Sequence, residues 1–358
     1  PANPFYPINI RTTIDSELQQ IAETLVDKHS IHNGGLVLID LDDNSVLSMV
    51  SRPRINRGDP FNEKNGSIEN VMLKQQITGS IFKTVVAAAA IDNHLDDPER
   101  LYNCSQKING EPDLTYQHGN LNFLDSFARS CNNTFANLAK ELKDIDSNLL
   151  EEYAKKLSLI GTTGWKGDIY HYHDFKQIPD EDNGRIFLSE DAKKDRNFVG
   201  LTGIGQHEVR ATPLAVANMM ATIARGGKKK MVKIASEIEY KNGTSLLTFK
   251  EKPLDGETIS SSTAKKLQNM LREVVINEDG TGKWFQNLPY EVAGKSGTGE
   301  TGKYLGAQQL HNKWFAGYFP YHRPKYALVV VNLDVPSDEG GVNLLFADMV
   351  NSIYENNQ

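Results

Sequence analysis

The chain contains an alanine-rich apolar run, Ile81-Phe-Lys-Thr-Val-Val-Ala-Ala-Ala-Ala-Ile91, which directly follows Ser80 and holds one charged residue, Lys83. Such a run predicts a helix that is buried on every side. Residues three apart on a helix share a face, so the Ser80 hydroxyl is expected within hydrogen-bond reach of the Lys83 amine. Burial lowers the pKa of an amine, and a neutral amine can take the proton of a serine hydroxyl. The run therefore predicts an activated serine nucleophile.

The same Ser-x-x-Lys spacing occurs again at Ser262 and Lys265. There the residues that follow, 266–272, form an amphipathic pattern with a polar face. We therefore predict that Ser262 caps the N-terminus of a helix and that Lys265 is solvated. Spacing alone does not distinguish the two copies, and the apolar surroundings favour Ser80.

Composition limits the classes of protein to consider. The chain has 358 residues, of which 39% are hydrophobic and 24% charged, which is typical of a globular protein with one large domain or two lobes. Its net charge of −7 argues against nucleic acid as a partner. No stretch is apolar and long enough to span a bilayer, and the start at Pro1 suggests that a preceding segment is missing. Cys104 and Cys131 are too few for a metal site and are either free or paired.

Periodicity predicts the order of elements. Helices are expected at 16–28, 80–93, 124–129, 134–142, 148–157, 212–225, 262–276 and 344–354. Strands are expected at 36–41, 45–50, 291–301, 313–319 and 326–335, with a hairpin over 231–249. Residues 161–205 are expected to form a long surface loop, and 302–311 a mobile lip. This order predicts an α+β fold, with an antiparallel sheet of about five strands, helices on both faces, and an all-helical lobe.

Two further motifs follow Ser80 in the chain, and each occurs once: Ser130-Cys-Asn132 and Lys295-Ser-Gly-Thr298. Ser130 could relay a proton to a leaving amine, and the Asn132 amide could bind a peptide group. Lys295 could supply positive charge, while Ser296 or Thr298 could bind a substrate carboxylate. Gly297 would allow a strand to approach the substrate closely, and backbone N–H groups could stabilise an oxyanion.

Other motifs in the chain are weaker. Gly294-Lys-Ser lacks the glycine that a phosphate-binding loop requires five residues earlier, where Pro289 stands instead. The Gly-x-Gly-x-x-Gly pattern of 297–302 is not followed by an amphipathic helix, as a dinucleotide site requires. His171-x-His173 has no third ligand at a sensible spacing. The sequence therefore predicts no metal and no cofactor.

The ordered motifs resemble those of penicillin-recognising serine enzymes, and the chain as a whole resembles the transpeptidase domain of a class B penicillin-binding protein. The resemblance covers about residues 12–354. It rests on Thr13-Ile-Asp-x-x-Leu-Gln19, Gly79-Ser-Ile-Phe-Lys83, Ser130-Cys-Asn-Asn-Thr-Phe135, Gly203-x-Gly-Gln206, Thr212-Pro-Leu-Ala215 and Trp314-Phe-Ala-Gly-Tyr-Phe-Pro320. Thr78 stands where the family usually has proline.

The resemblance implies a transpeptidase domain over residues 12–358. Its sheet lobe would comprise 12–79 and 262–358 and its mainly helical lobe 80–261, with 1–11 as the remnant of a linker or pedestal. The implied roles are Ser80 as nucleophile and Lys83 as base, with Ser130, Asn132 and Lys295 assisting. The oxyanion hole would be formed by the backbone N–H groups of Ser80 and Thr298, beside Ser296 and Gly297.

The resemblance further implies an extracytoplasmic enzyme that cross-links peptidoglycan stem peptides ending in D-Ala-D-Ala and is acylated by β-lactams. A missing N-terminal membrane anchor and other cell-wall synthesis proteins as partners are expected. The motifs leave alternatives open: a D,D-carboxypeptidase, a class D-like β-lactamase that uses a carboxylated Lys83, a β-lactam receptor without turnover, or a structural scaffold. The Glu-x-x-Leu-Asn segment of class A β-lactamases is absent from the sequence.

Overall fold

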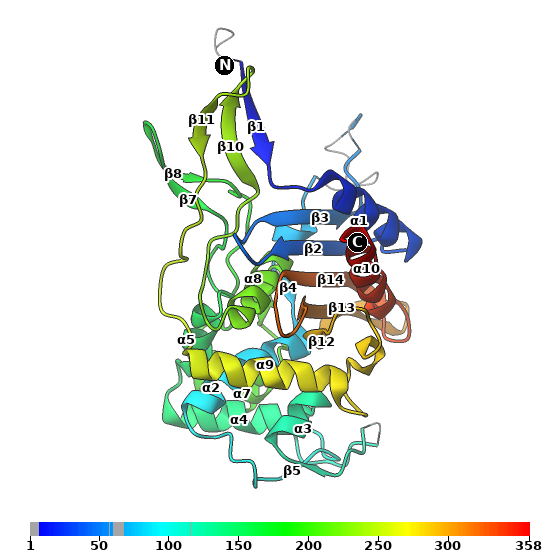
Figure 1. Ribbon diagram of the computed structural model, residues 1–358. Coiled ribbons are helices and arrows are strands. Elements are labelled where there is room, and N and C mark those ends of the chain that lie inside the picture. The colour runs from blue at the N-terminus through cyan, green and yellow to red at the C-terminus, as the bar shows by residue number, and fades with distance from the viewer. Residues whose placement is uncertain (1–6, 57, 60–67, 115) are drawn as a thin grey trace.

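The computed structural model describes residues 7–56, 58–59, 68–114 and 116–358. A five-stranded antiparallel sheet with the strand order β12-β13-β14-β2-β3 lies at its centre (Figure 1). The strands are β2 (Gly34–Asp40), β3 (Val46–Arg52), β12 (Ala293–Leu305), β13 (Gln308–Phe319) and β14 (Tyr326–Pro336). This arrangement confirms the predicted α+β fold, and it leaves β12, which carries the third motif, at the edge of the sheet.

Helices cover both faces of the sheet because its strands bury side chains on both sides. Leu36 and Leu38 of β2 belong to the apolar cluster that includes α1 (Ser16–Lys28) and α10 (Asn343–Asn356). Their neighbours Val37 and Ile39 belong to the cluster on the other face, which includes α8 (Pro213–Ala224). The alternation thus fixes the sheet between two helical layers, and Figure 1 shows α1 and α10 beside each other against it.

A group of helices lies beyond β12. It comprises α2 (Lys83–Asp92), α3 (Phe123–Ala128), α4 (Asn132–Ile145), α5 (Leu149–Lys156), α6 (Glu190–Lys194), α7 (Arg196–Gly203) and α9 (Ser261–Ile276), with the 3₁₀ turns η3 (Gly79–Phe82) and η4 (Lys283–Phe285). The 3₁₀ turn η2 (Val71–Leu73) lies instead against β2, β3 and α8. Helix α2 is buried from Lys83 to Ile91, as its apolar sequence predicts. The division into a sheet lobe and a helical lobe at the boundaries given above stays a prediction, and residues 1–6 of the predicted remnant lie outside the described residues.

Within the part of the chain that the structure describes, short strands make four smaller sheets. They are β1 (Ile8–Thr12) with β10 (Ala235–Tyr240) and β11 (Ser245–Thr248), β4 (Gln76–Ile77) with β9 (Arg210–Ala211), β5 (Tyr102–Asn103) with β6 (Asn120–Leu121), and β7 (Lys166–Ile169) with β8 (Tyr172–Lys176). The β10–β11 pair confirms the hairpin predicted over 231–249, and with β1 it extends away from the central sheet (Figure 1).

Three expectations about local structure are wrong. The segment 161–205 contains β7, β8, α6 and α7 instead of a long loop. Helix α7 escaped notice because glycine is a poor helix former; it packs so closely on α4 that a Cβ at Gly203 would lie 2.4 Å from the Cβ of Ala139. Ser260, not Ser262, caps α9, since its hydroxyl accepts the Thr263 N–H. Residues 302–311 mostly continue β12 and β13 as a paired hairpin, in place of an irregular lip.

Candidate active site

Ser80 lies on the 3₁₀ turn η3, and α2 begins three residues later at Lys83. In a 3₁₀ turn, residues i and i+3 eclipse each other. The amine nevertheless bonds to the second motif, because Lys83 Nζ donates to the Ser130 carbonyl at 2.7 Å, to Asn132 Oδ1 at 2.7 Å and to Ser130 Oγ at 3.1 Å. Among the described contacts there is no hydrogen bond between Ser80 Oγ and Lys83 Nζ, so that prediction is wrong for this state of the site.

Burial controls the charge of both lysines. The Lys83 side chain is fully buried, and burial lowers the pKa of its amine well below the usual value, with a further contribution from the charge of Lys295. Lys295 is also fully buried, and burial lowers its pKa to about 7. Its Nζ lies 5.5 Å from the centre of the Phe127 ring. Burial therefore favours the neutral form of the Lys83 amine, which can accept a proton.

The second motif occupies the turn between α3 and α4. Ser130 has a left-handed backbone with φ +59°, which costs energy for a residue other than glycine and is typical of functional sites. The next residue, Cys131, is joined to Cys104 by a disulfide with a Cα–Cα distance of 5.7 Å. The bond ties this turn to the segment that follows β5. The sequence left the state of the cysteines open, and the structure shows that they are paired.

The third motif lies on the edge strand β12. Ser296 Oγ donates to Thr281 Oγ1 at 2.8 Å, so Thr281 belongs to the site although no motif marks it. Gly297 was expected to let the strand approach the substrate. In the structure it makes room for another part of the chain, because a Cβ there would lie 2.6 Å from the carbonyl oxygen of Thr78.

Two glycines bring the first and third motifs together. Gly79 has φ +53°, and a Cβ there would lie 2.2 Å from the Thr298 carbonyl oxygen. Gly205 has φ +75°, and a Cβ there would lie 1.8 Å from the Gly79 carbonyl oxygen. The carbonyl oxygen of Gly205 accepts the Gly79 N–H at 3.0 Å. Both positions therefore require glycine. They place the residue before Ser80 against β12.

Gln206 is a residue whose role the sequence did not reveal, although it belongs to the Gly203-x-Gly-Gln206 segment. Its amide nitrogen donates to the Thr298 carbonyl at 3.1 Å, and its amide oxygen accepts the Glu300 N–H at 2.9 Å. The amide thus binds the edge of β12 as a further strand would. The N–H and C=O of one residue in an antiparallel strand point to the same side, so the Thr298 N–H also faces outward from the sheet.

The three motifs meet at one pocket of about 390 Å³. The predicted residues on its lining are Ser80, Ser130, Asn132, Ser296, Gly297 and Thr298. Lys83 and Lys295 are buried next to it and are the only predicted site residues that do not line it. Tyr116, Arg129 and Thr281 line the pocket as well, and no sequence motif indicated them. The arrangement places a serine hydroxyl, a buried amine and outward-facing backbone groups around one space.

Other kinds of site have less support in the described part of the chain. It contains no cluster of three or more His, Cys, Asp or Glu side chains arranged to hold a metal ion. His171 and His173 lie on the exposed β7–β8 hairpin, where His173 faces Asp168 at 3.2 Å. Within the same described residues, none of the helices combines the length and apolar character needed to cross a membrane.

Residues 34–348 match the family described as "Penicillin binding protein transpeptidase domain". The chain belongs to this family. The transpeptidase domain is 26% identical over 349 residues to penicillin-binding protein PbpB of Mycolicibacterium smegmatis. The aligned region covers 91% of this chain and 50% of PbpB. It is 34% identical over 142 residues to peptidoglycan D,D-transpeptidase MrdA of Haemophilus influenzae. Here the aligned region covers 36% of this chain and 21% of MrdA. The chain thus spans half or less of the length of these relatives.

Solved structures share the fold of the transpeptidase domain. The D,D-transpeptidase domain of a peptidoglycan glycosyltransferase from Eggerthella lenta superposes with a TM-score of 0.77 at 19% identity, covering 98% of this chain and 84% of that one. PBPA from Mycobacterium tuberculosis superposes with a TM-score of 0.76 at 19% identity, covering 97% of this chain and 80% of that one. These superpositions confirm the fold class predicted from the sequence.

Proposed function

We propose that the chain is a serine D,D-transpeptidase domain that cross-links peptidoglycan stem peptides ending in D-Ala-D-Ala. The observation that carries the proposal is the fully buried Lys83 amine, which bonds to Ser130 and Asn132 beside the pocket that Ser80 lines. Membership of the transpeptidase family and relatives named peptidoglycan D,D-transpeptidase support it.

Acylation would begin at Ser80. The neutral Lys83 amine takes the hydroxyl proton while Ser80 Oγ forms a bond to the carbonyl carbon of the penultimate D-Ala. The negative charge that develops on the carbonyl oxygen is stabilised by the N–H groups of Ser80 and Thr298. When the intermediate collapses, the C–N bond to the terminal D-Ala breaks. Ser130 passes a proton to the leaving amine, and the Ser130 Oγ distance of 3.1 Å from Lys83 Nζ suits this relay.

Substrate binding would use the rest of the site. The terminal carboxylate binds near Ser296 and Lys295, and its negative charge favours the protonated form of Lys295, whose pKa is about 7 before the substrate binds. The Asn132 amide binds the peptide group of the donor. An amine from a second stem peptide then attacks the ester carbonyl while the neutral Lys83 amine takes its proton. The new amide C–N bond remains, the bond from the acyl carbon to Ser80 Oγ breaks, and Lys83 returns the proton to Ser80 Oγ.

The setting of this reaction belongs to the same proposal. Peptidoglycan lies outside the cytoplasmic membrane, so the domain would act there, held by a membrane anchor on a preceding segment. One solved structure with the same fold is that of a peptidoglycan synthase complex in which polymerization and crosslinking are coordinated. We therefore expect other cell-wall synthesis proteins as partners, and β-lactams as covalent ligands on Ser80.

The test is intact-mass spectrometry of the protein mixed with a β-lactam. A stable adduct is expected on the wild-type protein, none on Ser80→Ala, and an unchanged adduct on Ser262→Ala, which removes the serine of the second Ser-x-x-Lys copy. Rapid return to unmodified protein would indicate a β-lactamase instead, and a folded protein without any adduct would contradict the proposal. With a D-Ala-D-Ala peptide and an amine acceptor, cross-linked product is expected; release of D-Ala with water as the sole acceptor would indicate a carboxypeptidase.

A further inference from the structure

The oxyanion hole that we assign to the Ser80 and Thr298 N–H groups is assembled from two separate segments, η3 and β12. Within the described residues no hydrogen bond joins these two segments directly. Glycine at position 79 lets them approach closely, since a Cβ there would lie 2.2 Å from the Thr298 carbonyl oxygen. Two donors stabilise one oxyanion only when both lie at hydrogen-bond distance from it. The spacing of the segments therefore needs a further support.

Two consecutive residues, Gly205 and Gln206, bind both segments. The Gly205 carbonyl accepts the N–H of Gly79, the residue before Ser80, at 3.0 Å. The Gln206 amide nitrogen donates to the carbonyl of Thr298 itself at 3.1 Å. Each donor of the oxyanion hole thus has a neighbouring backbone group held by the same short piece of chain. This piece sets the distance between the Ser80 N–H and the Thr298 N–H.

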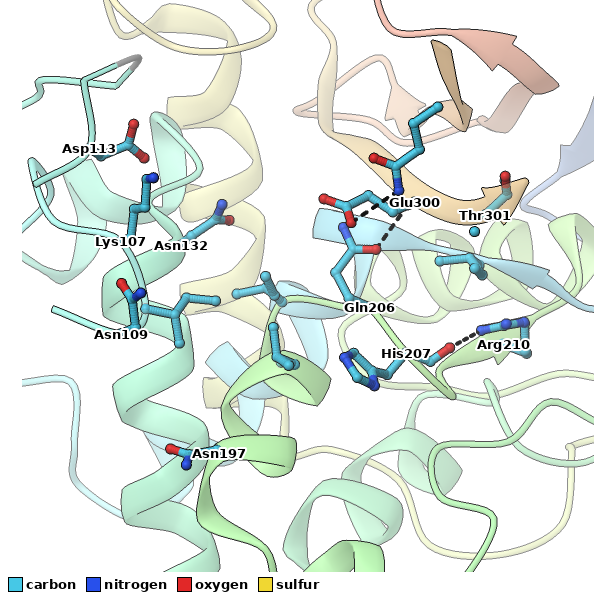
Figure 2. A pocket seen from close by; sticks show the side chains of 16 residues that line it. Lys107, Asn109, Asp113, Asn132, Asn197, Gln206, His207, Arg210, Glu300 and Thr301 are labelled. Carbon is cyan, nitrogen blue, oxygen red and sulfur yellow. Dashed lines mark hydrogen bonds between the residues drawn. The ribbon is translucent and has the colours of Figure 1, made fainter. Parts of the chain in front are cut away.

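The Gln206 amide binds β12 in the pattern of a parallel neighbouring strand. Its nitrogen binds the Thr298 carbonyl, and its oxygen accepts the N–H of Glu300, two residues farther along the strand, at 2.9 Å. Figure 2 shows the Gln206 side chain reaching to Glu300. One residue of a parallel strand would bond to the same two groups, and it would leave the Thr298 N–H free. The side chain therefore secures the strand without occupying the donor that the oxyanion requires.

The strand β12 needs support at this point of its length. It is an edge strand, so no further strand pairs with its outward N–H and C=O groups. Its regular pairing with β13 runs from Ala293 to Glu300, and the register shifts between Glu300 and Tyr304. Such a shift disrupts the ladder locally, and Thr298 lies only two residues before it. A displacement of about 1 Å at a reacting centre can cost about 100-fold in rate, so this end of the ladder must be held.

We propose that Gln206 is a positioning residue for acylation, whose amide fixes the Thr298 N–H at the distance from the Ser80 N–H that the oxyanion requires. The inference rests on the proposed function, because it requires that Ser80 is acylated. The hydrogen bonds of the oxyanion hole are strongest in the transition state, where the carbonyl oxygen becomes negative. Loss of the amide should therefore slow the chemical step and leave the binding of the reactant nearly unchanged.

The test measures acylation by a chromogenic cephalosporin at a series of concentrations, which separates its Kd from the acylation rate constant. Gln206→Met removes both hydrogen bonds, whereas Gln206→Glu keeps the size and the acceptor for the Glu300 N–H but, once ionised, has no donor for the Thr298 carbonyl. The control is Gln309→Met, because Gln309 binds the Glu300 carboxylate at 3.4 Å and not the backbone of β12. We expect the rate constant to fall by about 10- to 100-fold in both Gln206 variants, with Kd within about threefold, and no change in Gln309→Met.

A merely structural role would lower the fraction of protein that becomes acylated and leave the rate constant of that fraction unchanged. That result, a loss confined to Kd, or an equal fall in Gln309→Met would each overturn the inference. Near-UV circular dichroism establishes folding, and the isosteric Gln206→Glu decides the question if Gln206→Met does not fold. If the wild-type Ser80 reacts and the Gln206 variants react equally fast, the positioning role alone is wrong. If the wild-type protein is not acylated at all, the proposed function fails and the inference with it.

Discussion

Replacing Lys295 by methionine should make the protein more stable while it disables the site. The amine is fully buried, and its pKa falls from the ordinary 10.5 to about 7. At pH 7 the unfolded chain holds this proton and half of the native molecules have lost it. At 1.36 kcal/mol per pH unit, the difference amounts to about 4 kcal/mol of lost stability. Methionine keeps a straight chain of similar volume without a charge, so Lys295→Met should recover much of that free energy.

The difference in unfolding free energy between the wild type and Lys295→Met should depend on pH. Between about pH 7 and 10.5 the unfolded state binds more protons at this position than the native state, so wild-type stability rises with pH. The Lys295→Met variant lacks the group, and the difference between the two proteins should therefore shrink toward zero by about pH 10.5. Below about pH 6 the amine is protonated in both states, and the difference should stay constant.

The measurement is urea unfolding followed by tryptophan fluorescence at a series of pH values, with free energies from linear extrapolation. Lys265→Met is the matched control, because this lysine is exposed and its removal should leave stability nearly unchanged at every pH. A Lys295→Met protein that is less stable than the wild type at pH 7, or a difference that stays constant up to pH 10, would refute the reasoning. Acylation by a β-lactam should be slower in the variant, since the positive charge beside the substrate carboxylate is gone.

Two other changes test how the backbone supports the site. Gly205→Ala would place a Cβ 1.8 Å from a backbone oxygen, and it should destabilise the protein by several kcal/mol and abolish acylation of Ser80. The control Gly243→Ala has a similar φ of +81° but open space around it, and it should cost about 1 kcal/mol and leave acylation intact. Comparable losses in both variants would show that the close approach at Gly205 is unimportant. Replacing Cys104 and Cys131 together by alanine removes the disulfide, which spans a sequence separation of 27, and should lower the free energy of urea unfolding by about 3.5 kcal/mol. β-Lactam acylation should also slow down, because the turn before α4 is no longer tied in place. Unchanged acylation would show that the disulfide does not position the site.

Much of the local structure could be predicted from the sequence because its causes are local. Asp15 precedes an apolar pattern and caps α1, and its carboxylate accepts the Glu17 and Leu18 N–H groups. Pro213 opens α8 after the capping residue Thr212. Short apolar runs identified the strands of the sheet, and the motif order identified Ser80 and its companions as one site. Each of these signals lies within a few residues of the feature that it specifies.

The tertiary structure decided which groups touch. The Ser80–Lys83 spacing predicted a hydrogen bond within one helix, but the Lys83 amine bonds to a turn 47 to 49 residues away, because a buried amine is stabilised by whichever oxygens the packing brings to it. The pairing of Cys104 with Cys131 depends on a Cα–Cα distance that no spacing reveals. The importance of Gln206 comes from the edge of β12 beside it, which exists only after distant segments have packed together.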